Sequence, residues 1–67
     1  MQFYELISVI RDYDSIKVID AISRREYYRG TKSKLPIVLF EKIWKYEVDN
    51  VHPFKDEINN YLVVEVF

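Results

Sequence analysis

The sequence of 67 residues predicts a single small α+β domain over residues 1–67, with two short helices packed on a mainly antiparallel four-stranded sheet. Two segments space their apolar residues at helical intervals. Four others are rich in β-branched or alternating apolar residues, and turn-forming residues separate the segments. The predicted order is helix, strand, strand, helix, strand, strand.

The first predicted helix covers residues 3–11, whose apolar positions follow the i, i+3, i+4, i+7 spacing of one helical face: Phe3, Leu6, Ile7 and Ile10. Asp12, Asp14 and Ser15 then favour a turn and end the helix. An alternative for residues 3–11 is a strand that continues into Ile16.

Two strands are predicted next, over residues 16–21 and 24–31, because both segments are rich in β-branched or aromatic residues between turn formers. The short connection suits a hairpin, with Ser23 near the turn. Successive side chains of a strand point to opposite faces, so we expect Tyr27 and Tyr28 on opposite faces and only one of them in the core.

The second helix is predicted over residues 37–45, directly after Pro36, which fits the first turn of a helix. Helical spacing places Phe40 and Trp44 on the core side and turns Val38 away from it.

The third strand is predicted from Tyr46 through Val48 and Val51, with its end near Pro53. The last strand covers residues 61–67 and alternates regularly. One face carries Leu62, Val64 and Val66, and the other carries Tyr61, Val63, Glu65 and Phe67.

The amino-acid composition excludes several kinds of functional site. With no cysteine, one histidine and one glycine, the chain lacks the residues for a disulfide, a thiolate zinc site, a two-histidine metal centre or a phosphate-cradling loop, so we expect no metal and no cofactor. No apolar run approaches the roughly 20 residues that span a bilayer, and no signal peptide is visible at the N-terminus. We therefore expect a cytoplasmic protein without a membrane partner.

Catalytic residues are few. His52 with Asp49, Asp56 and the serines contains the residue types of a nucleophile–base set, but neither their spacing nor a glycine-rich elbow supports that assembly. The paired carboxylates Asp12/Asp14 and Asp56/Glu57 fit solvated loops. The sequence predicts a protein that is not an enzyme, with His52 at a surface or hinge.

Charge is unevenly distributed. The chain carries a net charge of −1, yet residues 24–34 hold five basic residues and one acidic residue, between two acidic segments. This basic arm also contains Tyr27 and Tyr28, and it allows three interpretations: a solvated strand edge, a protein-binding or dimer surface, or a nucleic-acid contact. The acidic segments on both sides disfavour the nucleic-acid contact. Its candidate interaction residues are Arg24, Arg25, Tyr27, Tyr28, Arg29, Lys32 and Lys34.

The last strand supplies further interaction candidates, because its second face is also apolar. These are Tyr61, Val63 and Phe67. In a small domain without disulfide or metal, this pattern predicts self-association, as a homodimer through a sheet face or edge.

Five short segments of the chain form a recognisable series: Tyr4-Glu5-Leu6-Ile7, Ile16-Lys17-Val18-Ile19-Asp20, Tyr28-Arg29-Gly30-Thr31, Leu35-Pro36 and Leu62-Val63-Val64-Glu65-Val66. In these segments the chain resembles a group of very small proteins encoded by bacteriophages and prophages of Gram-positive bacteria. That group has no common established activity. The resemblance implies phage origin and a bias toward small binders of host proteins.

The functional expectation is therefore a non-catalytic phage protein that binds a host protein and inhibits a defence or nucleic-acid-processing enzyme, as anti-CRISPR-like inhibitors do. Acidic stretches around Asp12/Asp14 and Asp49 to Glu57 would then imitate nucleic acid, although the basic arm is the stronger candidate for the contact. The alternative is a small nucleic-acid-binding or phage assembly protein.

Overall fold

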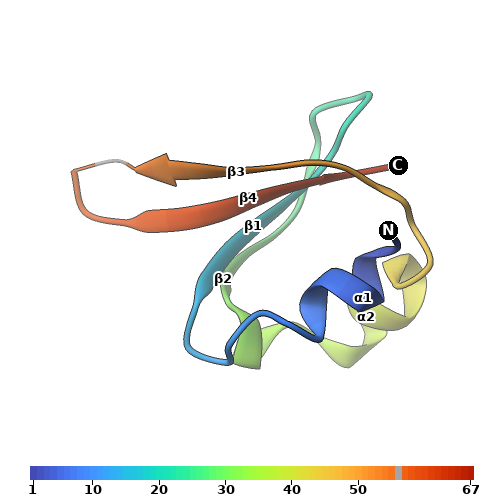
Figure 1. The fold of residues 1–67 in the computed structure, drawn as a ribbon, viewed down its shortest axis with the longest axis horizontal. Helices are drawn as coiled ribbons and strands as arrows, with labels where there is room; N and C mark the ends of the chain where they lie inside the picture. Colours follow the sequence, from blue (N-terminus) through green and yellow to red (C-terminus); the bar gives the residue numbers. More distant parts are fainter. Residues whose placement is uncertain (56) are drawn as a thin grey trace.

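The computed structural model describes residues 1–55 and 57–67. Its elements are α1 Phe3–Ile7, β1 Ser15–Asp20, β2 Glu26–Thr31, a short 3-10 helix η1 Lys32–Lys34, α2 Ile37–Ile43, β3 Val48–Lys55 and β4 Asn60–Val66. The α+β class and the order α-β-β-α-β-β are confirmed (Figure 1). The first segment is a helix and not a strand, and it is shorter than predicted.

The strands form one sheet in the order β2-β1-β4-β3. Each outer pair, β1 with β2 and β3 with β4, is an antiparallel hairpin, whereas the central pair of β1 and β4 is parallel. The sheet is therefore mixed. The connection from β2 to β3 runs through α2 and sets the two hairpins side by side, an arrangement that hydrophobic alternation within each strand does not reveal.

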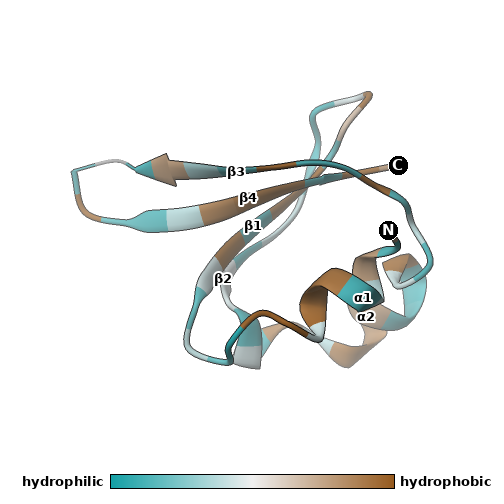
Figure 2. Cartoon of the chain, in the orientation of Figure 1, coloured by the Kyte–Doolittle hydropathy of each residue, from teal (hydrophilic) through white to brown (hydrophobic). Residues whose placement is uncertain are grey.

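Both helices cover the same face of the sheet and enclose the core (Figure 1). Its buried members come from α1 and the turn after it, from β1, from α2 and from β4: Phe3, Ile7, Ile10, Ile16, Val18, Ile43, Val64 and Val66. Leu62 packs against them, so the predicted inward face of β4 is confirmed. In Figure 2 the apolar colour runs along the middle of β1 and β4, as expected for the two central strands.

The last turn of helix α2 contacts the core through Ile43 and not through the predicted Trp44. Ile43 is fully buried, while Trp44 is 37% exposed, so the prediction for Trp44 was wrong. The helix ends at Ile43, and the Trp44 ring packs at the helix end against Tyr4, with 5.5 Å between ring centroids. Phe40 contacts the core as predicted, and Val38 is exposed.

Strand β3 continues through Pro53 to Lys55, so the predicted end near Pro53 was wrong. Proline lacks a backbone N–H and interrupts a ladder that needs hydrogen bonds on both sides. Because β3 pairs only with β4 and lies at the edge of the sheet, it tolerates Pro53. The proline also makes this edge a poorer template for a further strand.

A β-bulge in β2 overturns the prediction for Tyr27 and Tyr28. Val18 lies opposite Tyr28 and the next residue of β1 lies opposite Glu26, which leaves Tyr27 as an extra residue. Both tyrosines consequently pack against the core. The Tyr27 ring lies 6.2 Å from that of Tyr46, and the Tyr28 hydroxyl donates a 2.6 Å hydrogen bond to the carbonyl of Thr31.

We predict that Ile43→Ala lowers the free energy of unfolding by about 2–5 kcal/mol, because it leaves a cavity under the sheet. Ile37→Ala is the matched control, since it is the same substitution in the same helix at a side chain that is 74% exposed. Urea unfolding of both variants measures the difference. Equal losses would contradict the described helix orientation.

Gly30 supplies a second stability prediction. Its φ of +150° lies in a region that side chains rarely adopt, and an added Cβ would lie 2.8 Å from the Tyr28 hydroxyl oxygen. Gly30→Ala should cost on the order of 1–3 kcal/mol in urea unfolding. The cost should shrink in a Tyr28→Phe background, where the hydroxyl is absent, and an unchanged stability of Gly30→Ala would contradict the geometry.

Candidate interaction face

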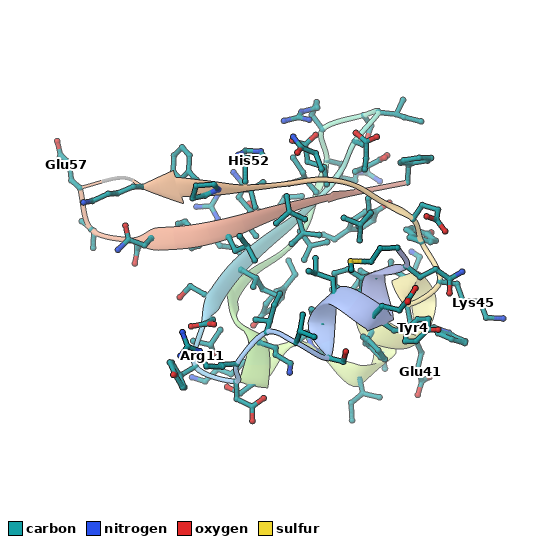
Figure 3. The ribbon with its side chains drawn as sticks, in the orientation of Figure 1. Tyr4, Arg11, Glu41, Lys45, His52 and Glu57 are labelled. Carbon is teal, nitrogen blue, oxygen red and sulfur yellow. The ribbon has the colours of Figure 1, made fainter. Side chains whose placement is uncertain are left out.

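The sheet face that points away from the helices carries the candidate site, which we call the open face. Its side chains lie at alternate positions of β1, β3 and β4 and on either side of the two core-facing tyrosines of β2, and the strand register places them next to one another across the sheet. They are Lys17 and Ile19 of β1, Glu26 and Arg29 of β2, Tyr61, Val63 and Glu65 of β4, and Asn50, His52 and Phe54 of β3. Figure 3 shows His52 on this side of the sheet.

Strand register arranges the open face in rows that cross the sheet. Lys17 lies opposite Arg29 on one side and Val63 on the other, and His52 lies opposite Val63. One row therefore runs Arg29, Lys17, Val63, His52 from edge to edge, and we call it the basic row. The side chain of Val63 is almost fully buried and forms the apolar base of this row.

An aromatic pair lies beside the basic row. Phe54 is opposite Tyr61 in the β3–β4 hairpin, with ring centroids 6.4 Å apart. The Arg29 guanidinium lies 5.7 Å from the centre of the Tyr61 ring, and the Lys17 ammonium lies 5.9 Å from that of Phe54. These cation–π distances connect all four strands, and Phe54 still exposes 46% of its surface.

Arg29 is held in place by Glu26. Both Nε and Nη2 of Arg29 donate to Oε1 of Glu26, at 3.1 and 2.8 Å. The hydrogen bonds to Glu26, together with the negative charge of Glu26, raise the pKa of Arg29, so the guanidinium stays charged.

Glu65 binds two partners at the centre of the sheet. Its side chain is only 10% exposed. Oε1 accepts a 2.5 Å hydrogen bond from Nη1 of Arg24, and Oε2 lies 2.9 Å from Nε2 of His52. The hydrogen bonds from Arg24 and His52 lower the pKa of Glu65. His52 is on the surface, as expected, and its acidic partner is Glu65.

Arg24 reaches Glu65 from the β1–β2 turn. Its φ of 65° lies in the left-handed region. The turn is fixed by Asp20, whose carboxylate accepts hydrogen bonds from the Ile22 N–H at 3.2 Å and the Ser23 hydroxyl at 2.7 Å. These two bonds, the Ser23 bond most strongly, lower the pKa of Asp20. Ser23 thus lies in the hairpin turn where the sequence predicts it.

The predicted basic arm does not form one surface. Of its members, Arg29 lies on the open face and Arg24 reaches that face from the β1–β2 turn to bind Glu65. Tyr27 and Tyr28 belong to the core side. Lys32 turns toward α1: its ammonium donates a 2.7 Å hydrogen bond to the carbonyl of Ile10.

The remaining candidates take different positions. Arg25 is exposed in the turn before β2, and Lys34 is exposed in η1. Tyr61 and Val63 join the open face. Phe67 follows β4 at the C-terminus and is 54% exposed. Of the residues weighed for catalysis, Asp56 lies outside the described residues.

Sequence reasoning missed Lys17 and Phe54 and assigned no binding role to His52. Their alternation along β1 and β3 is visible in the sequence, but their grouping depends on the parallel pairing of β1 with β4. Without that register, no sequence signal places Lys17 beside Phe54.

Within residues 1–55 and 57–67 there is no pocket and no group of three or more metal-ligating side chains. No helix in the same residues has the length and apolar character to cross a membrane. Comparison with protein-family models, curated proteins and solved structures finds no match.

We predict that the stability of this protein depends on the ionisation of Glu65. Its pKa is lowered in the folded state, so its contribution is fully present above the unfolded value of about 4.3 and is lost as the pH falls through the folded value. Urea unfolding between neutral pH and about pH 3 should show this loss.

Glu65→Gln should make the pH dependence in this acidic range shallower. Glu41→Gln, on the exposed surface of α2, is the control and should leave the dependence unchanged. The same slope in Glu65→Gln and the wild type would contradict the assignment.

Proposed function

We propose that this chain is a non-catalytic binding protein that attaches to a host protein through its open face. The observation that carries the proposal is the pair of the exposed Phe54 and the partly buried Tyr61, with Arg29 and Lys17 against the rings, on the sheet face that the helices do not cover.

Aromatic and arginine side chains contribute most of the binding energy in protein interfaces. Here they are positioned on strands, and hydrogen bonds or ring contacts already fix their orientation. A partner would therefore find these groups pre-ordered, which reduces the entropy lost on binding.

The biological part of the proposal rests on the resemblance to small phage and prophage proteins. We propose that the protein acts in the bacterial cytoplasm and inhibits a host defence or nucleic-acid-processing enzyme. Homodimerisation stays a separate prediction. Among the sheet edges available to a second copy, that of β3 contains Pro53, which disfavours its use.

The decisive experiment is affinity purification of the tagged protein from a bacterial host. We expect one stoichiometric host protein that is lost with the double variant Phe54→Ala/Arg29→Ala. The control is Arg11→Ala/Tyr13→Ala, which removes another cation–aromatic pair, 5.1 Å apart, in the loop between α1 and β1. The captured protein, once purified, should lose activity when wild-type protein is added.

Circular dichroism would verify that both double variants are folded. If a host protein is retained equally by the wild type and the open-face variant, the proposal is wrong. It is also wrong if the captured enzyme keeps its full activity at saturating wild-type protein.

A further inference from the structure

We infer that the open face recognises a short acidic segment of the partner protein in which carboxylates alternate with apolar side chains. This inference rests on the proposed function and specifies the chemistry of its partner. The feature behind it is the basic row lying directly beside the aromatic pair of Phe54 and Tyr61.

The two cations of β1 and β2 have unused capacity for an anion. Among the described residues, Lys17 forms no ion pair, and its ammonium lies over the Phe54 ring. Arg29 donates Nε and Nη2 to Glu26 and lies against Tyr61, and its side chain is half exposed, so an anion can still approach the guanidinium from solvent. A carboxylate placed above the basic row would therefore meet two charged donors without breaking an existing ion pair.

The spacing of the basic row fits an extended peptide. Neighbouring strands lie about 4.8 Å apart, so the row from Arg29 to His52 spans about 14 Å. Side chains on one side of an extended segment repeat about every 6.7 Å, and three of them span about 13 Å. The aromatic pair lies two residues along the strands, also about 6.7 Å away, where apolar side chains of the same segment would reach it.

Charge on the open face favours a short acidic segment over a long polyanion. Glu26 and Glu65 share the face with Lys17, Arg24 and Arg29, so its formal charge is only slightly positive. The whole chain has a net charge of −1. Nucleic acid would bring many phosphates to a face with few free cations, and the acidic flanks would repel it.

A second copy of this chain fits less well. A two-fold interface uses the same surface patch of both copies, so the slightly positive charge of the open face would meet an equal charge on the second copy. Like charges facing each other in a desolvated interface are unfavourable.

The test is a nuclear magnetic resonance titration of the 15N-labelled full chain with a short peptide that alternates aspartate with leucine and phenylalanine. We expect amide shifts concentrated around Lys17, Arg29 and Tyr61. Replacing each aspartate by asparagine, or introducing Lys17→Ala/Arg29→Ala, should weaken binding about tenfold. The control Lys42→Ala, on the exposed surface of α2, should bind as the wild type does.

Four outcomes would overturn the inference, three of them from the titration and one from the free protein. The first three are equal affinity for the asparagine peptide, shifts confined to other surfaces, and binding of an oligothymidine strand without binding of the peptide. Self-association that buries the open face, detected by sedimentation of the free protein, would also overturn it. If only the peptide fails while host-protein capture still depends on Phe54 and Arg29, the acidic chemistry is wrong and the proposed function stands.

Discussion

The parallel pairing of β1 with β4 is the constraint on which the rest of the structure depends. Within the sheet described here, it is the only strand pairing that joins the two hairpins, each of which is local in sequence. On one face it brings Ile16 and Val18 beside Val64 and forms the base of the core. On the other it aligns Lys17 with Val63, so the same register assembles the candidate interaction face.

A buried carboxylate stabilises the pairing of β1 with β4 at one end of these two strands. Glu65 of β4 accepts hydrogen bonds from Arg24 in the β1–β2 turn and from His52 in β3, so a single side chain connects both hairpins. Burial of a charge is costly unless its oxygens are satisfied, and here both oxygens have partners. The hydrogen bonds of Glu65 on the open face and the buried apolar side chains on the opposite face therefore both stabilise the central strands β1 and β4.

The sequence predicted local features well and long-range features poorly. The alternation of Leu62, Val64 and Val66 and the exposure of Val38 follow from spacing within one element, and the structure confirms them. The exposure of Trp44 depends on where α2 ends. The grouping of Lys17 with Phe54 depends on pairing between segments far apart in the chain. The periodicity of apolar residues within one segment does not reveal such pairing.

The bulge at Tyr27 has a consequence beyond the core. In a regular strand, residues three apart face opposite sides of the sheet, yet Glu26 and Arg29 share the open face and form an ion pair. The extra residue shifts the alternation of side chains along β2. The strand therefore turns both Tyr27 and Tyr28 toward the core and still places the guanidinium of Arg29 on the open face beside Glu26. The length of β2, counted in single residues, therefore matters as much as its composition: homologous chains should vary here by substitution and not by insertion or deletion.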